Sequence, residues 1–140
     1  MMQIEPRSLR SQTIVDGALK ILDSHEKWIQ SEEATDKEGN SVNATNPEAT
    51  CWCLEGALTK AAYDLGFFGE IKADYSDQEF IQRWKKLEYE IDQLFQEATY
   101  YDEHHRYNEL PDIIDFNDDS ETDYHDIIEL LERASEVYYR

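Results

Sequence analysis

Cysteine, long apolar runs and positive charge are all scarce in this chain of 140 residues. The two cysteines, Cys51 and Cys53, stand two positions apart, so a disulfide through them cannot join distant parts of the fold. No apolar run approaches the roughly 20 residues of a transmembrane helix, and the N-terminal stretch MMQIEPRSLR contains no apolar signal-peptide core. We therefore expect a cytoplasmic protein that does not associate with membranes.

Several motifs of enzyme active sites are also missing from the sequence. It contains no serine nucleophile elbow, no glycine-rich phosphate loop and no HExxH zinc pattern. Paired acids are common, but with 32 acids in the chain some pairing is unavoidable. We therefore assign no catalytic residue, no cofactor site and no metal ligand, and we expect a non-enzymatic protein.

Negative charge is what the chain has in excess. Its 32 acids and 13 bases give a net charge of -19, and residues 101–140 alone carry thirteen acids against three bases. Such a field repels nucleic acid and anionic membranes and attracts basic protein surfaces. Solubility alone would explain an acidic face. A more specific interpretation is that the acidic surface binds a basic partner protein.

The spacing of apolar residues predicts an all-α fold. Apolar residues recur at intervals of three and four in four segments: Ser11–Ile29, Pro47–Leu65, Ser76–Tyr101 and around Tyr124–Tyr138. A capping box begins the third segment, and Ser120 or Thr122 would cap the last helix. Leu110–Ile114 predicts a single turn, and a polar loop follows it. We predict a single compact domain over residues 1–140, of about four amphipathic helices, with about eight flexible residues at the N-terminus.

A polar, turn-rich insert, Ser31–Asn46, separates the first two predicted helices. An irregular hairpin would fit there, although its strand propensity is poor. Asn46 and Pro47 then form a typical helix start, with Asn as the N-cap and Pro at the first helical position.

The stretch CWCLEGAL, residues 51–58, holds both cysteines. On a helix, residues two apart are separated by about 200°, so Cys51 and Cys53 would point to opposite sides and could not share a zinc ion. Gly56 inside a helix costs about 1 kcal/mol relative to alanine, which indicates that another backbone crosses closely there. We interpret the stretch as packing and not as a metal or redox site.

Residues Asp115–Asp126 place oxygen-bearing side chains at the relative positions of an EF-hand calcium loop. Ser120 stands where that loop needs glycine, and Asp126 stands where it needs the longer glutamate. A loop followed by a capped helix start explains the same acids, and we favour that interpretation over a calcium site.

His104 and His105 are the chain's candidates for a general base or a metal ligand. Adjacent histidines on a helix diverge by about 100°, so they rarely share one ion. We favour a fraying helix end with cations near its C-terminus. A small metal-dependent or hydrolytic enzyme that uses these histidines and nearby carboxylates is the alternative hypothesis.

Three short motifs occur in a suggestive order: Trp52-Cys53 with Gly56-Ala57-Leu58, then Phe116-Asn117-Asp118, then the segment Asp126–Ala134. Together they resemble a small family of bacterial and phage domains of unknown function, over roughly Ile14–Ala134. The resemblance implies an all-α fold and a bacterial or phage source, and it supplies no activity, substrate or catalytic residue. Its structural signature in this chain consists of Trp52, Cys53, Gly56, Phe116, Asn117 and Asp118.

One physical hypothesis joins these motifs. Asn117 and Asp118 precede the last predicted helix and could accept hydrogen bonds from the backbone near Trp52 or Gly56. The signature would then lock the second helix to the last.

For function we expect an acidic protein-interaction module that docks on a basic protein surface. In a phage setting it would be a nucleic-acid mimic that inhibits a host nuclease or defence complex, because dense carboxylates imitate phosphates. It would not bind nucleic acid directly. The candidate contacts are Asp115, Asp118, Asp119, Glu121, Asp123, Asp126 and Glu129. A structural, self-associating helical domain is a further hypothesis, but self-repulsion at this net charge favours a monomer.

Overall fold

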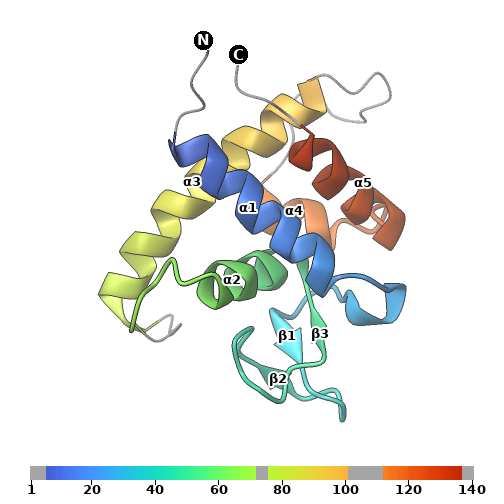
Figure 1. Ribbon diagram of the computed structural model, residues 1–140. Helices are drawn as coiled ribbons and strands as arrows, with labels where there is room; N and C mark the ends of the chain where they lie inside the picture. Colours follow the sequence, from blue (N-terminus) through green and yellow to red (C-terminus); the bar gives the residue numbers. More distant parts are fainter. Residues whose placement is uncertain (1–5, 72–75, 101–111, 137–140) are drawn as a thin grey trace.

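The structure is a computed structural model that describes residues 6–71, 76–100 and 112–136. Within these ranges the chain forms five α-helices, one 3-10 helix and three short strands (Figure 1). In chain order they are α1 (Pro6–Ile21), η1 (His25–Lys27), β1 (Ala34–Thr35), β2 (Ser41–Val42), β3 (Cys51–Trp52), α2 (Leu54–Asp64), α3 (Gln78–Tyr100), α4 (Ile113–Asp118) and α5 (Tyr124–Ser135). The prediction of a mainly helical chain is confirmed, but a small sheet means that the fold is not strictly all-α.

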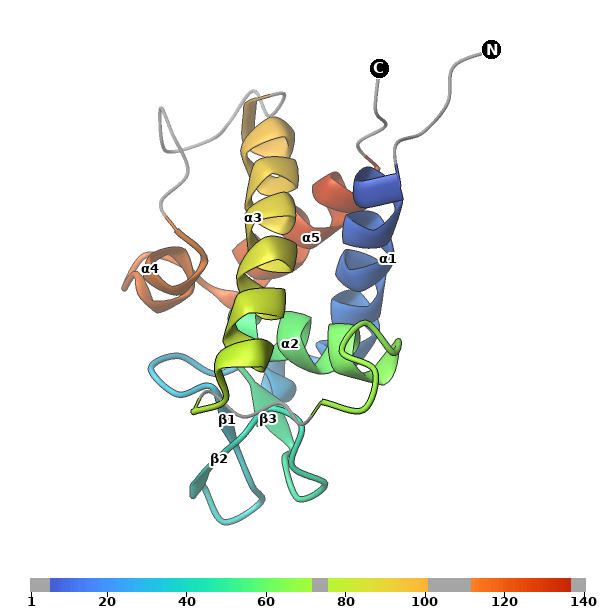
Figure 2. The same ribbon diagram turned by 90° about the vertical axis from the view of Figure 1, so that its left-hand side faces the viewer.

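The helix α1 lies at the centre of the helical packing. It contacts α2, α3 and α5, and α3 also contacts α5. Figure 2 shows α2 crossing near one end of α1 and α3, on the side where the sheet lies. Ile14 and Val15 of α1 and Leu58 of α2 are fully buried in one cluster that also takes in residues of α3 and α5. The apolar stripes predicted from the sequence therefore do face one another.

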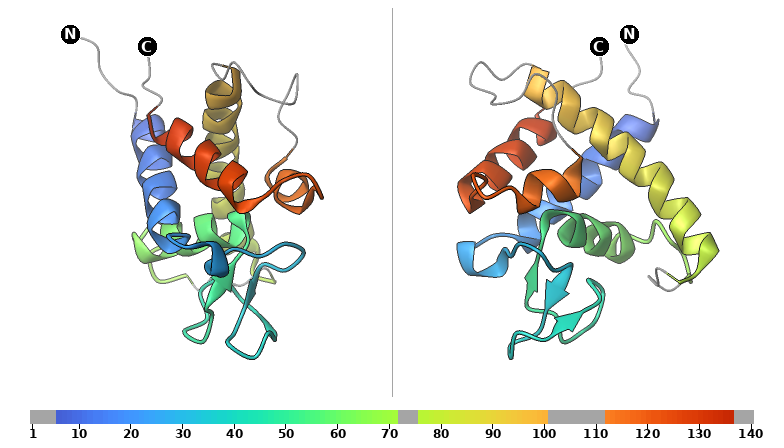
Figure 3. Two further views of the ribbon diagram at one scale, coloured as in Figure 1. Left: turned by 90° about the vertical axis from the view of Figure 1, so that its right-hand side faces the viewer. Right: turned by 180° about the vertical axis from the view of Figure 1, so that it is seen from behind.

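The turn-rich insert forms a three-stranded antiparallel sheet in the order β2-β1-β3. Ala34 of β1 pairs with Val42 on one side and with Trp52 on the other. The indole nitrogen of Trp52 donates to the carbonyl oxygen of Ala44 at 2.9 Å, which holds the connection between β2 and β3 against the sheet. Figure 3 shows this sheet at one end of the molecule, next to α2.

The second helix begins later than predicted, at Leu54 and not at Pro47. Asn46 does start a turn, because its side chain accepts a hydrogen bond from the backbone nitrogen of Glu48 at 2.8 Å. The chain then leaves the turn, and the backbone nitrogen of Thr50 donates to Thr35 at 2.8 Å. The β-branched Thr50 has a weak helix propensity, and pairing with β1 satisfies the backbone in its place.

Other element ends also differ from the prediction. The first helix ends at Ile21 and not at Ile29. The helix α4 covers residues 113–118, most of which were predicted to be a loop. Asp123, and not Ser120 or Thr122, caps α5, and it forms a reciprocal capping box with Asp126.

A polar contact ties the start of α5 to the end of α1. The hydroxyl group of Tyr124 donates to the carbonyl oxygen of Leu22 at 2.6 Å. The ring of His25 stacks on the Tyr124 ring with the centroids 5.3 Å apart. This contact helps to fix α4 and α5 relative to the segment that follows α1.

Candidate functional site

The side chain of Asn117 is the centre of a buried hydrogen-bond network. Its Oδ1 atom accepts from the indole nitrogen of Trp28 at 2.6 Å and from the backbone nitrogen of Leu54 at 2.9 Å. Its Nδ2 atom donates to the carbonyl oxygen of Ile29 at 3.2 Å and to Asp118 at 2.9 Å. Only 1% of Asn117 is exposed. These five residues, which we call the Asn117 network, join α4, the start of α2 and the segment after η1.

The hydrogen bond predicted between Asn117 and the backbone near Trp52 and Gly56 is therefore present, since Leu54 lies between those two residues. Its setting differs from the prediction, because Asn117 lies inside the short helix α4. Phe116 beside it is also buried. The network joins α4 to the start of α2, and not the last helix to α2 as predicted.

Asp118 has a different partner from the one predicted. Its Oδ1 atom accepts from the backbone nitrogen of Ser31 at 2.8 Å. Ser31 has a φ of 72°, a left-handed conformation that is uncommon for a residue other than glycine. The preceding residue, Gln30, donates to the carbonyl oxygens of Asn117 at 2.9 Å and Asp119 at 3.0 Å. The segment 28–31 thus satisfies the carbonyl end of α4, which a six-residue helix would otherwise leave open.

Gly56 lies where the sheet meets α2. A Cβ atom at this position would be 2.2 Å from the carbonyl oxygen of Glu33 and 3.2 Å from its carbonyl carbon. The same oxygen accepts from the backbone nitrogen of Cys53 at 3.1 Å. The close backbone crossing predicted at Gly56 is present, and the crossing backbone is that of Glu33, just before β1.

The structure corrects the placement of both cysteines. Cys51 lies on β3 and Cys53 is the N-cap of α2, so the helical geometry from which we predicted that they diverge was wrong. The Sγ atom of Cys51 donates to the carbonyl oxygen of Glu26 at 3.2 Å, and the Sγ atom of Cys53 accepts from the backbone nitrogen of Gly56 at 3.3 Å. Both are free thiols.

The thiol of Cys53 is poorly suited to nucleophilic chemistry. Burial raises its pKa to about 12, against the opposing effect of the hydrogen bond from Gly56. The nearby carboxylates of Glu55 and Glu33 raise it further. Because the thiolate is the reactive form, this side chain is almost entirely unreactive at neutral pH.

Several acids of Asp115–Asp126, the segment that resembles a calcium loop, hydrogen-bond to the backbone of the same segment. The side chains of Asp119 and Asp123 accept from the backbone nitrogens of Glu121 and Asp126, each at less than 3.0 Å. Asp115 lies in the first turn of α4. In the described part of the chain, no group of three or more His, Cys, Asp or Glu side chains could hold a metal ion.

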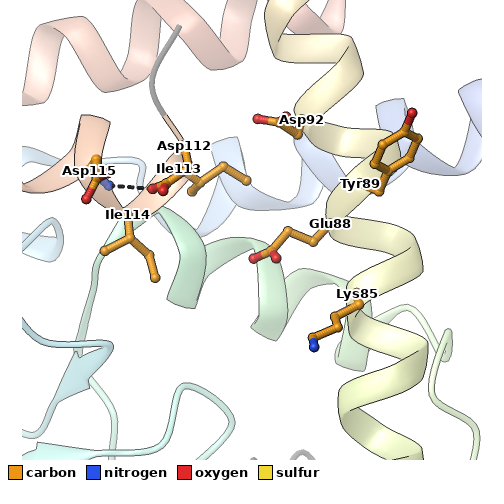
Figure 4. A pocket seen from close by; sticks show the side chains of 8 residues that line it. All are labelled: Lys85, Glu88, Tyr89, Asp92, Asp112, Ile113, Ile114 and Asp115. Carbon is orange, nitrogen blue, oxygen red and sulfur yellow. Dashed lines mark hydrogen bonds between the residues drawn. The ribbon is translucent and has the colours of Figure 1, made fainter.

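Two pockets flank α4, and acidic side chains line both. The first, which we call the α3–α4 pocket, has a volume of about 520 Å³. Figure 4 shows its lining side chains, which come from α3 and from the start of α4. Its acids are Glu88, Asp92, Asp112 and Asp115. Lys85 is its basic lining residue, and the exposed Tyr89 lies at its edge.

The second pocket, which we call the α2–α4 pocket, has a volume of about 480 Å³. Its acids are Glu32, Glu33, Glu55 and Asp118. Ile114, which is 52% exposed, lines both pockets. We call the two pockets together the acidic groove. Among its described lining residues, eight are acidic and one is basic.

Glu55 and Glu88 line the two halves of this groove. Burial of Glu88, and then the negative charge of Glu55, raise the pKa of Glu88 to about 7. The charges of Asp92 and Asp112 act in the same direction. The indole nitrogen of Trp84 donates to the Oε1 atom of Glu55 at 3.3 Å. The groove therefore contains a carboxyl group that titrates near neutral pH.

The predicted partner-binding acids lie partly at this groove. Asp115 and Asp118 line it, one in each pocket. The other five, Asp119, Glu121, Asp123, Asp126 and Glu129, belong to the α4–α5 turn and to α5 and line neither pocket. The groove acids of α2 and α3 could not be singled out from the sequence, because nothing in their spacing distinguishes them from the other acids of the chain.

His104 and His105 lie outside the described residues, so the alternative enzymatic hypothesis stays a prediction. No helix among the described residues has both the length and the apolar content needed to cross a membrane.

These observations define a class of protein: a mainly helical chain with a small sheet, a buried asparagine network and an acidic groove. The chain matches the model of the family of unknown function DUF6197 over residues 6–137 and belongs to that family. The expected membership of a family of unknown function is thereby confirmed, whereas a bacterial or phage origin stays a prediction. No curated protein and no solved structure is significantly similar to the chain.

Proposed function

We propose that this protein is a non-enzymatic interaction module that binds a basic protein surface through the acidic groove. The observation that carries the proposal is the lining of the groove, where eight acids and a single lysine surround the exposed Ile114. A surface with this excess of one charge attracts the opposite charge and raises the rate of association with it.

The side chains of the groove suit lysine and arginine in particular. Both have an apolar stem that packs on apolar surface while the charged head stays among polar groups. Ile114 and Tyr89, which is 63% exposed, offer apolar contact for such stems. The carboxylates on both sides of Ile114 offer acceptors for the heads, and charge-assisted bonds of this kind are the stronger ones.

A finer form of the proposal is that the protein mimics nucleic acid and inhibits a basic host protein such as a nuclease. It is supported by the spacing of Asp112, Asp115 and Asp118, all of which are exposed. Residues three apart lie on the same face of a helix, so α4 and its N-cap present a row of carboxylates. This form predicts that the protein competes with DNA for its partner, which a DNA-displacement assay on that partner would test.

A peptide of nine arginines is a suitable probe of the groove, because arginine keeps its charge at every working pH. Isothermal titration calorimetry would compare the wild type with the double variant Asp112→Asn/Asp115→Asn. Asn is also a good N-cap, so the α4 cap that Asp112 provides to the backbone nitrogen of Asp115 is kept. We expect the variant to bind at least about tenfold more weakly, and binding to weaken with salt.

The matched control is the double variant Glu48→Gln/Glu70→Gln. Both residues are exposed, and neither lines a pocket. The control changes the net charge by the same amount, so it separates binding in the groove from general attraction to an acidic protein. Equal weakening of both double variants, or no binding of the peptide at low salt, would contradict the proposal.

A further inference from the structure

The acidic groove also contains exposed apolar side chains. Among the described residues four large hydrophobic side chains are exposed, and two of them, Tyr89 and Ile114, line the groove. Ile114 lines both pockets, so it forms the wall between them. Figure 4 shows Tyr89 on α3 and Ile114 on α4, with Glu88 between them in this view. Apolar side chains that gather in a groove with a polar rim are typical of an interaction site.

Backbone N–H groups hold acids of both pockets in place. In the α2–α4 pocket the backbone nitrogen of Ser31 donates to Asp118 at 2.8 Å. In the α3–α4 pocket the backbone nitrogen of Asp115 donates to Asp112 at 2.8 Å. An ionised carboxylate has about four acceptor positions, so each of these acids can also accept from a ligand. Because their positions are already fixed, binding costs little side-chain entropy. Preorganised acceptors therefore lie on both sides of Ile114.

The elements around the groove favour a helical ligand. None of its described lining residues belongs to a strand, so these residues offer no sheet edge to which an extended peptide could add. A helix satisfies its own backbone groups and binds a groove through the side chains of one face. We therefore expect a helix and not an extended segment.

We propose that the acidic groove binds a basic amphipathic helix of a partner protein. This inference rests on the proposed function and adds the form of the partner to it. The apolar stripe of the helix packs on Ile114 and, at the edge of the groove, on Tyr89. Lysine or arginine side chains on the two flanks of the stripe reach the acids, one flank in each pocket.

Charge complementarity selects this ligand. The eight acids among the described lining residues repel an acidic helix and attract a basic one. A second copy of this chain is disfavoured for the same reason, because its own net charge is -19.

Two synthetic peptides of identical composition test the proposal. Each is alanine-rich and has about 18 residues, since shorter isolated helices are only marginally stable. In the first peptide, leucines form one stripe and arginines flank it on both sides. In the second, the arginines form one stripe and the leucines form another on the opposite face. Circular dichroism would check that both are equally helical. In isothermal titration calorimetry at low salt, we expect the full-length protein to bind the first peptide at least about fivefold more tightly.

A double-mutant cycle tests the apolar contact itself. It combines Ile114→Ala with replacement of each leucine of the first peptide by alanine in turn. For the leucine that contacts Ile114, each single change should weaken binding about fivefold. The double change should cost clearly less than the product of the two, because the side chains interact. Tyr89→Ala gives a second cycle at the edge of the groove.

The matched control is Leu65→Ala. Leu65 is 48% exposed, close to the 52% of Ile114, and it lines neither pocket. We expect it to leave the affinity for the first peptide unchanged. Since all three substituted positions are exposed, the variants should fold, which thermal unfolding would check.

The inference is overturned if the two helical peptides bind equally well or not at all. It is also overturned if Ile114→Ala and Tyr89→Ala show no coupling with any leucine. In either case the proposed function stands as long as the peptide of nine arginines distinguishes Asp112→Asn/Asp115→Asn from its control. A nine-arginine peptide that makes no such distinction would instead contradict the proposed function itself, and the inference with it.

Discussion

The side-chain oxygen of Asn117 lies 2.6 Å from the indole nitrogen of Trp28, although 89 residues separate the two in the chain. The same oxygen accepts from the backbone nitrogen of Leu54 at 2.9 Å. One amide group therefore holds together the segment before the sheet, the start of α2 and the helix α4. No apolar contact could do this with the same directional selectivity, because hydrogen bonds depend on angle as well as distance.

Replacing Asn117 with alanine should lower the free energy of unfolding by about 1 to 3 kcal/mol. The change leaves the Trp28 indole and the Leu54 backbone nitrogen without their acceptor in a buried place, and unsatisfied buried donors are costly. Urea unfolding followed by tryptophan fluorescence would measure the loss. The control is Asn43→Ala, at an exposed position in the sheet connection, where we expect a change within about 0.5 kcal/mol. A loss for Asn117→Ala no larger than that of the control would show that the network adds nothing to stability.

Alanine at position 56 should destabilise the protein by about 2 kcal/mol or more, although alanine is the better helix former. Its Cβ atom would lie 2.2 Å from the backbone oxygen of Glu33, and a backbone group cannot move aside as a side-chain end can. Gly17→Ala is the comparison, because there the nearest atom is the Cβ of Ala61 at 2.9 Å. Thermal unfolding of both variants should show the larger loss for Gly56→Ala. The reverse order would mean that the sheet is not held tightly against α2.

The raised pKa of Glu88 makes stability depend on pH. The folded state binds more protons than the unfolded state between the ordinary glutamate pKa and about 7, so stability falls as the pH rises through this window. Glu88→Gln stays neutral and escapes this loss. Because Glu88 is only half-buried, solvent screening reduces the effect, and we expect the variant to be more stable than the wild type by about 1 to 2 kcal/mol at pH 8. Urea unfolding should show that the difference disappears towards about pH 4.5. A constant difference across this range would refute the prediction.

Cys53 should react slowly with thiol reagents while the protein is folded. With the pKa raised to about 12, very little thiolate is present at pH 8. The variant Cys51→Ser leaves Cys53 as the single thiol, and Ellman's reagent would measure its rate. We expect the native rate to be about a hundredfold or more below the rate after unfolding in guanidinium chloride. Similar rates in both conditions would mean that the thiol is accessible and ionised.

Helix α3 shows what the sequence predicts well. Phe80, Trp84, Leu87 and Ile91 recur at the helical spacing, and all of them are buried. A long periodic segment of this kind predicts its own structure, because the apolar stripe and the helical period agree over several turns. Its predicted bounds, Ser76–Tyr101, are within two residues of those observed.

The segment before α2 shows why other parts could not be predicted. Asn46 and Pro47 are typical of a helix start, but the chain forms only one turn there. The backbone of Thr50 instead hydrogen-bonds to Thr35, fifteen residues earlier. Such pairing depends on tertiary context, which local propensity does not contain. The acidic groove was missed for a similar reason. Glu55 and Glu88 line the same groove only because α2 and α3 both pack against α1.

The Asn117 network also bears on how the molecule assembles during synthesis. Leu54 precedes its acceptor by 63 residues, and ribosomes add roughly 5 to 20 residues per second. The start of α2 therefore waits about 3 to 13 seconds for Asn117 to be made. Contacts between distant residues also close slowly, because the intervening chain must lose entropy first. During that interval the indole nitrogen of Trp28, before the sheet, and the backbone nitrogen of Leu54, at the start of α2, lack the acceptor that they have in the folded protein.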